Sequence, residues 1–238
     1  MRDGSDRHRA AWRRDDGRIR VKVCCIASAR EAEIALEAGA DFLGLVSAMP
    51  SGQGPIAESL IAEIVGVVGA RGETVLLTSR QEAPAIEAQL ARMRPAVVQL
   101  VDALAVSALA DIRRAHPDVV QLQVIHVRDE SSVAEAVRVA AHVDALLLDS
   151  GNPAAAVKEL GGTGRVHDWR VSAEIVRAVS VPVVLAGGLH AGNVADAVQV
   201  VHPFGVDVCS GVRSAGALDA GKVRDFIAAA RETRRVRA

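Results

Sequence analysis

Two reactive side chains follow apolar runs that lie far apart in the chain. The run at 21–26 carries two adjacent thiols, Cys24 and Cys25, and the run at 145–148 is followed by the carboxylate of Asp149. A thiol that ionises near neutral pH can act as a general base, and a carboxyl group can act as the matching acid. If each run is a buried strand, Cys24 and Asp149 lie at strand tips and could move one proton across a small substrate.

The residues alone leave a second interpretation open for each member of this pair. Free cysteines are often small buried apolar residues, so Cys24 could serve packing only. Asp149 could cap the loop that follows it, although a lone carboxylate after a buried run is costly without a partner or a task.

Glycine-bearing stretches indicate where an anion could bind. They occur at 161–164 (GGTG), 186–189 (AGGL) and 210–211 (SG). Glycines let backbone N–H groups approach an anion closely, and the N-terminus of a following helix adds a favourable dipole. The same glycines could form tight turns only. The candidate phosphate-binding residues are Gly164, Gly187, Gly188, Ser210 and Gly211.

These candidate residues can act together only if strands and helices bring them to one end of a sheet. The sequence predicts such an arrangement, because short strands alternate with helices along the chain. Apolar, β-branched runs predict strands at 20–25, 42–46, 74–77, 97–100, 121–127, 145–149, 183–186 and 205–209. Apolar residues at three-to-four-residue spacing predict helices at 29–37, 57–68, 83–93, 106–115, 132–141, 172–179, 191–200 and 222–231. Eight such units predict an α/β fold, the (β/α)8 TIM barrel, as a single domain over 20–238. In this fold the chemistry lies at the carboxyl ends of the strands, and phosphate is often held after strands seven and eight.

Residues 1–19 precede the predicted barrel and are rich in Arg and Asp. They lack the apolar core of a signal peptide or a membrane-spanning helix. We therefore expect a flexible, disordered extension in solvent.

The composition narrows the class of partner. The 238 residues carry a formal net charge of −1, which gives no electrostatic case for nucleic acid or an anionic membrane. Three cysteines, two of them neighbours, argue against a disulfide framework and for a reducing, cytoplasmic setting. The seven histidines show no metal-ligand spacing, so we expect neither a metal nor a cofactor. The expected partner is a small phosphorylated molecule, bound by a monomer or a homodimer.

A family resemblance is carried by segments that occur in order from about 21 to 231. The first half contains KVCCI, EAGADFLGLV, VVQL and LLLDS, and the second half contains GGTGRVHDW, PVVLAGGL, NVADAV and PFGVDVCSGV. In these segments the chain resembles phosphoribosylanthranilate isomerase, the Amadori isomerase of tryptophan biosynthesis. The second half is the more specific part of the match.

The resemblance implies isomerisation of N-(5-phosphoribosyl)anthranilate, or a related phosphoribosyl amine, to a 1-amino-1-deoxyribulose 5-phosphate. In that family a cysteine at the position of Cys24 removes the proton from ribose C2, and an aspartate at the position of Asp149 protonates the ring oxygen. An aspartate at the position of Asp207 lies near the substrate's amino group. His126, within the fifth predicted strand, could face the barrel mouth or be a hydrogen-bonded core residue.

The chain departs from the family pattern where the family binds the anthranilate ring. Cys25 stands where the family has glycine, Gly54 where it has the arginine that clamps the carboxylate, and Val101 where it has histidine. A bidentate carboxylate clamp needs a guanidinium. Arg30 is a candidate substitute, as are three further arginines near predicted strand ends: Arg80, Arg128 and Arg165. We expect that restoring Arg at Gly54 improves use of phosphoribosylanthranilate.

Three functions therefore stay open. The chain could isomerise phosphoribosylanthranilate with a different carboxylate clamp. It could isomerise a related compound with another aglycone in specialised metabolism. It could also be a barrel without catalytic activity that binds a sugar phosphate.

Overall fold

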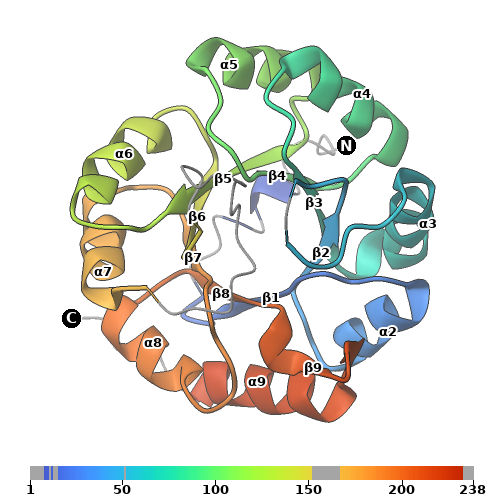
Figure 1. The fold of residues 1–238 in the computed structure, drawn as a ribbon, viewed down its shortest axis with the longest axis vertical. Coiled ribbons are helices and arrows are strands. Elements are labelled where there is room, and N and C mark those ends of the chain that lie inside the picture. Colours follow the sequence, from blue (N-terminus) through green and yellow to red (C-terminus); the bar gives the residue numbers. More distant parts are fainter. Residues whose placement is uncertain (1–7, 11, 13–15, 51, 152–166, 233–238) are drawn as a thin grey trace.

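The barrel predicted from the alternating pattern is present. The structure is a computed structural model, and it describes residues 8–10, 12, 16–50, 52–151 and 167–232. Eight parallel strands pair in sequence order, and β1 pairs with β8 to close the ring (Figure 1). The strands are β1 (Arg20–Val23), β2 (Phe42–Val46), β3 (Glu73–Thr78), β4 (Val97–Leu100), β5 (Val120–His126), β6 (Ala145–Asp149), β7 (Val183–Leu185) and β8 (Gly205–Val208).

Helices form an outer ring around the strands (Figure 1). They are α2 (Ala29–Glu37), α3 (Glu58–Val68), α4 (Ala83–Met93), α5 (Val106–Ala115), α6 (Ser131–Ala140), α7 (Trp169–Ala178), α8 (Val194–Val201) and α9 (Ala220–Glu232). Two short 3-10 turns, η1 (Gly69–Arg71) and η2 (Ser210–Val212), and a small antiparallel pair, β9 (Arg213–Ser214) with β10 (Ala217–Leu218), complete the described elements. Within the described ranges, no helix is both long and apolar enough to span a membrane.

Side chains pack in two layers because strand residues alternate between the two faces of a sheet. One cluster fills the barrel interior, with Phe42, Val75 and Leu147 among its members. The other joins the strands to the helices and includes Leu43 and Leu146, the sequence neighbours of interior residues. Burial of both layers fixes the register of the strands, because a slip of one residue would exchange the layers.

The differences from the predicted boundaries are small, and two of them matter for the site. The first strand ends at Val23 rather than at 25, so Cys24 and Cys25 begin the following loop. The seventh helix starts at Trp169, earlier than the predicted 172, because the side chain of Asp168 accepts a hydrogen bond from the N–H of Arg170 and caps the helix.

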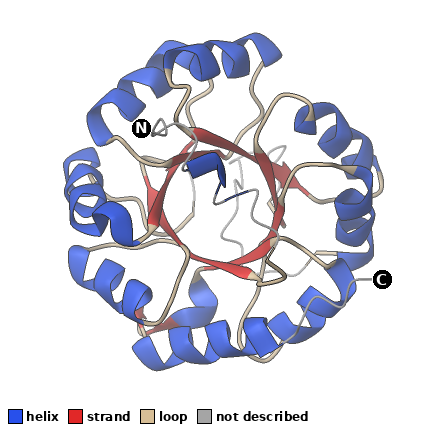
Figure 2. Ribbon diagram, turned by 180° about the vertical axis from the view of Figure 1, so that it is seen from behind, coloured by secondary structure: helices blue, strands red, loops and turns tan. Residues whose placement is uncertain are grey.

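The described part of the N-terminal segment packs on the barrel, which departs from the expected solvated tail. Trp12 is 1% exposed, and its ring lies 4.6 Å from that of Phe42 and 5.6 Å from that of Phe204, centroid to centroid. His8 pairs with Glu73 at 2.5 Å and Arg9 with Asp144 at 3.1 Å. A short helical piece of this segment lies across one open end of the barrel (Figure 2). The composition of the segment does not predict this contact, because most of its residues are charged and the buried ring that makes the contact belongs to a single tryptophan, Trp12.

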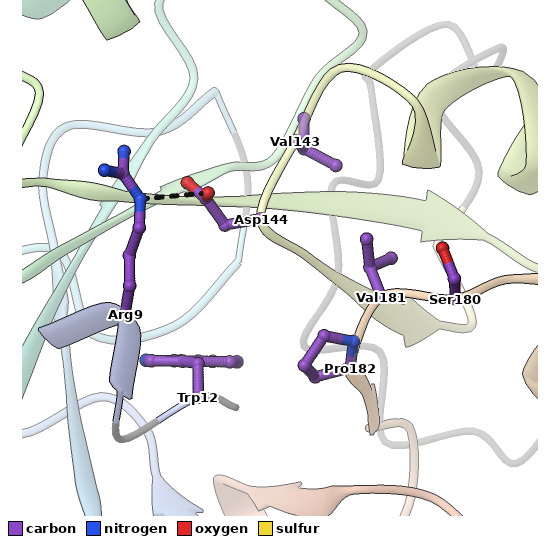
Figure 3. A pocket seen from close by; sticks show the side chains of 7 residues that line it. All are labelled: Arg9, Trp12, Val143, Asp144, Ser180, Val181 and Pro182. Carbon is purple, nitrogen blue, oxygen red and sulfur yellow. Dashed lines mark hydrogen bonds and ion pairs between the residues drawn. The ribbon is translucent and has the colours of Figure 1, made fainter. Parts of the chain in front are cut away.

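A cavity of about 320 Å³ lies beside Trp12, at the end of the barrel where strands begin. Figure 3 shows Arg9 joined to Asp144 above the flat indole ring, with Pro182 and Val181 opposite. Asp144 and Pro182 directly precede β6 and β7. This cavity is therefore on the face opposite the strand tips that carry Cys24 and Asp149.

Candidate active site

Cys24 lies directly after β1 and belongs to a buried polar group. Lys22, two residues earlier on the same face of the strand, is fully buried, and its Nζ lies 2.9 Å from Oδ2 of Asp207. Asp207 is the register partner of Lys22 on β8. Gly44 on β2 leaves the space that this group needs: a Cβ there would lie 2.8 Å from Cys24 Sγ and 3.1 Å from Lys22 Nζ. The sulfur and the ammonium group therefore meet above Gly44.

This environment favours the thiolate of Cys24. A hydrogen bond from the Cys25 thiol lowers the pKa of Cys24, and the Lys22 charge lowers it further, against the opposing effects of burial and of Asp207. Burial by itself would lower the pKa of Lys22, but the charges of Asp207 and Cys24 outweigh burial and raise that pKa above its usual value. Burial raises the pKa of Asp207, and Lys22 opposes this shift. A permanent ammonium beside Cys24 is what a catalytic thiolate requires.

Cys25 takes a backbone conformation that is unusual for a residue with a side chain. Its φ is 61°, in the left-handed region that favours glycine. Arg213 holds the conformation by donating to the carbonyl oxygen of Cys25, and the same guanidinium pairs with both carboxylate oxygens of Glu31 at 3.0 Å. Glu31 also caps the start of α2, because its N–H donates to the Ser28 hydroxyl while its carboxylate accepts from the N–H of Ala27, just before the N-cap.

The loop after β2 folds over Cys25. The Cys25 thiol lies 3.5 Å from the carbonyl oxygen of Gln53, and Gly54 has a φ of +84°. A Cβ on Gly54 would lie 2.7 Å from the Cβ of Cys25. The two departures from the family pattern are thus one structural change, since the side chain at 25 occupies the space that a side chain at 54 would need.

Asp149 ends β6 and is 9% exposed. Its Oδ1 accepts a 2.7 Å hydrogen bond from the N–H of Ser150. Its charge acts on His167, whose pKa is lowered by burial and partly restored by Asp149, and on Asp207, whose pKa it raises. Asp149 therefore faces the same interior as the Lys22–Asp207 pair.

His126 is the register partner of Asp149 on the neighbouring strand β5. Its Nε2 lies 3.0 Å from the carbonyl oxygen of Val101. Because a carbonyl oxygen only accepts, Nε2 carries a proton. Nδ1 is buried and has no hydrogen-bond partner among the described residues, and the same holds for Oδ1 of Asp207. Two buried polar atoms on the interior face thus remain open to a ligand.

The loops after β7 and β8 meet at the mouth of the barrel. Gly187 and Gly188 have φ values of 86° and 63°, so both need glycine. A Cβ on Gly211 would lie 2.2 Å from the carbonyl oxygen of Leu189, which shows how closely the two loops approach. Ser210 is exposed and starts η2. These loops have the close backbone approach that a phosphate cradle requires.

Arg30 and Arg80 lie near acidic side chains of the helices α2 and α3. Gly164 and Arg165 fall outside the described residues. Arg30 is exposed in the first turn of α2, where its charge acts on Glu33. Arg80 lies 3.5 Å from Glu58.

Three functional candidates were missed by the sequence analysis. Lys22 could have been found, since a lysine two residues before Cys24 in an apolar strand must share its face. Arg213 and Cys209 carry no such signal, because their contacts with Cys25 join residues more than 180 positions apart. Within the described ranges no group of three or more His, Cys, Asp or Glu side chains is placed to hold a metal ion.

Comparison with known proteins gives a consistent family. The model of the N-(5′-phosphoribosyl)anthranilate (PRA) isomerase family matches residues 21–229. The N-(5′-phosphoribosyl)anthranilate isomerase of Nitrobacter winogradskyi is 37% identical over 212 residues, which cover 89% of this chain and 92% of that protein. The enzyme of the same name from Natronomonas pharaonis is 37% identical over 214 residues, covering 89% and 97%.

Solved structures agree with these sequence matches. Phosphoribosyl anthranilate isomerase from Thermotoga maritima superposes with a TM-score of 0.78 at 26% identity, covering 90% of this chain and 99% of that one. A phosphoribosyl anthranilate isomerase in complex with reduced 1-(o-carboxyphenylamino)-1-deoxyribulose 5-phosphate has a TM-score of 0.75 at 25% identity, with the same coverage.

Proposed function

The chain belongs to the N-(5′-phosphoribosyl)anthranilate isomerase family, and from this premise we propose that Cys24 and Asp149 perform the Amadori rearrangement of phosphoribosylanthranilate. The product is 1-(o-carboxyphenylamino)-1-deoxyribulose 5-phosphate. The observation that carries the assignment is the buried group of Cys24, Lys22 and Asp207, because it lowers the pKa of a thiol at a strand tip that faces the barrel interior.

The side chains of Cys24 and Asp149, at the same end of the barrel, perform different steps of the reaction. Asp149 gives its proton to the ribose ring oxygen, the ring opens and the C1–N bond becomes an iminium. The Cys24 thiolate then takes the proton from ribose C2, and the electrons of that C–H bond form the enolamine. The enolamine loses its C2 hydroxyl proton to solvent and gains a proton at C1, which gives the ketone. Lys22 stabilises the thiolate before this step, and the open oxygen of Asp207 is placed to accept a hydrogen bond from the substrate's amino group.

A direct assay tests the function. Anthranilate compounds fluoresce, so loss of phosphoribosylanthranilate fluorescence on addition of purified protein reports turnover. Complementation of a tryptophan auxotroph lacking the isomerase gives a second readout. A protein that binds reduced 1-(o-carboxyphenylamino)-1-deoxyribulose 5-phosphate and yet fails both tests would be a sugar-phosphate-binding barrel without isomerase activity.

The phosphate is expected to bind the loops after β7 and β8, through backbone N–H groups of Gly187, Gly188 and Gly211 and the Ser210 hydroxyl. Gly188→Val should raise KM about tenfold or more with a smaller effect on kcat, because it blocks hydrogen bonds to a charged group, each of which contributes roughly 1.5–3 kcal/mol. Steady-state kinetics measure the split.

A matched control separates this loss from backbone strain. Gly69 has a similar φ of 52° and open space around its Cβ position, and it lies at the carboxyl end of α3, away from the mouth. Gly69→Val should lower stability and leave KM unchanged. An equal rise in KM for both variants, or a sulfate ion bound only at the face where strands begin, would remove the phosphate assignment.

The geometry around Gly54 changes the effect expected of Gly54→Arg, the variant meant to bind the anthranilate carboxylate. Gly54→Arg alone should destabilise the protein, because residue 54 has a positive φ and its new Cβ would collide with that of Cys25. We expect about 2–4 kcal/mol from the left-handed backbone and the overpacking together. The double variant Cys25→Gly/Gly54→Arg removes the collision and should recover part of that loss.

Urea unfolding and KM for phosphoribosylanthranilate measure this coupling. The single variant Cys25→Gly is the control, and it should be mild. A fall in KM for the double variant relative to this control means that an arginine in the loop after β2 can bind the substrate's carboxylate. An unchanged KM means that another cation already binds the carboxylate. If the KM of the native protein is also low, the alternative substrate with a different aglycone is rejected.

We further propose that the enzyme works in the cytoplasm as a monomer or homodimer. The low cysteine count, with two of the three cysteines adjacent in the sequence, supports a reducing compartment. Light scattering on the purified protein decides between one and two chains.

A further inference from the structure

Cys209, at the end of β8, has no role in the isomerisation proposed above, yet its sulfur lies 2.7 Å from that of Cys25. The two cysteines are 184 positions apart and follow neighbouring strands, β8 and β1. The hydrogen bond from Cys24 N–H to the carbonyl oxygen of Val208, 2.8 Å long, ties these strand ends together. A disulfide bond is about 2.05 Å long, so the two sulfurs need to approach each other by about 0.65 Å.

The surroundings of the two thiols suit an exchange reaction. Cys209 is half-buried and so reachable from solvent, whereas Cys25 is 7% exposed. The Arg213 guanidinium, bound to the Cys25 carbonyl oxygen, is in electrostatic contact with both sulfurs. Hydrogen bonds with Cys209 and Cys24, together with burial, raise the pKa of the Cys25 thiol, so Cys209 is the thiol that meets the small disulfide first. An accessible nucleophile, a sheltered partner and a nearby cation are thus present together.

We propose that Cys25 and Cys209 form a reversible disulfide at the barrel mouth, and that this modification site slows the isomerase when low-molecular-weight disulfides accumulate. The thiolate of Cys209 attacks the small disulfide, forming a mixed disulfide and releasing one small thiolate. Cys25 loses its proton to solvent, and its sulfur attacks that of Cys209. The new bond forms, the mixed disulfide breaks and the second small thiolate leaves, so the protein loses two electrons and the small disulfide gains them.

The bond reaches the catalytic group through Cys25. Cys25 follows Cys24 directly and has a φ of 61°, so closing the bond shifts the backbone that positions the Cys24 sulfur. The bond also joins the loop after β1 to the loop after β8, which carries Ser210 and Gly211. This part of the inference, the loss of activity, rests on the proposed function, whereas formation of the bond does not.

The test treats the purified full chain with excess oxidised glutathione and counts thiols by alkylation after denaturation. We expect two of the three thiols to disappear, a peptide pair joined through Cys25 and Cys209 in a non-reducing digest, and recovery of all three on adding dithiothreitol. kcat/KM near neutral pH should fall about tenfold or more, because the bond moves Cys24 and the loop after β8, and small misplacements of catalytic groups slow turnover.

Two variants keep the outcomes apart. Cys209→Ser should form no internal bond and should keep its activity in oxidised glutathione. Cys24→Ser should still form the bond, which tests the modification site in a protein without the proposed base. Three free thiols in the treated wild type, a bond between Cys24 and Cys25, or equal inactivation of Cys209→Ser would each overturn the proposal. A bond between Cys25 and Cys209 in a protein that does not isomerise phosphoribosylanthranilate would keep the modification site and reject the proposed function.

Discussion

Cys24→Ser and Asp149→Asn are each expected to lower kcat by about 10²-fold or more, the scale on which a general base or acid contributes. Serine keeps the size of Cys24 but does not ionise near neutral pH, so the C2 proton has no acceptor. Asparagine has the same shape and can still accept the hydrogen bond from the N–H of Ser150, but its amide has no acidic proton to give to the ring oxygen. Steady-state turnover of phosphoribosylanthranilate measures both effects.

Cys209→Ser is the matched control for the first variant, since it makes the same chemical change next to the site and should leave kcat close to that of the native protein. KM should change little in the two catalytic variants, because both groups act on the transition state. If Cys25→Ser abolishes turnover while Cys24→Ser does not, the base is assigned to the wrong thiol. Retained turnover in Asp149→Asn would move the acid role to another group.

Lys22→Met should reduce both stability and activity. The ammonium group is fully buried and pairs with Asp207, so its loss leaves a buried carboxylate without its counter-ion. Breaking a buried pair from one side costs about 3–5 kcal/mol. The positive charge of Lys22 also lowers the pKa of Cys24. Without that charge the pKa rises, the thiolate forms only at higher pH, and the acid limb of kcat/KM moves to higher pH.

The double variant Lys22→Met/Asp207→Asn separates the two effects. It removes both charges, so much of the lost stability should return in urea unfolding. Asp207 raises the pKa of Cys24, so the acid limb in the double variant should lie between those of the native protein and the single variant. An acid limb that stays in place in Lys22→Met would show that the ammonium group does not tune the base.

The barrel could be predicted from sequence because its signals are local. Each strand is a short β-branched run and each helix has apolar residues at helical spacing, as in Ala83–Met93, whose bounds match the prediction. The end of β1 was predicted two residues late, since Cys24 and Cys25 are as apolar as the strand before them. What ends this strand is the positive φ of Cys25, held by Arg213, and that contact spans 188 positions.

The site was partly predictable for the same reason. Cys24, Asp149 and the glycines after β7 stand at strand ends, which a repeating pattern locates. The meeting of Lys22 with Asp207 and of Cys25 with Cys209 depends on closure of the ring between β1 and β8, which sequence spacing does not measure. Gly54 shows the limit most clearly, because its role as the space for the Cys25 side chain appears only when two loops are placed together.

Trp12 has a consequence for the order of folding. During synthesis this residue leaves the ribosome early, but Phe204, against which it stacks, is made 192 residues later. At roughly 5–20 residues per second, Trp12 waits for many seconds without its full contact surface. Its docking and the pairing of β1 with β8 both need the last quarter of the chain, so they belong to the final, long-range stage of folding, where contacts form slowly. Until then the nascent chain lacks the stacking contact of Trp12 with Phe204.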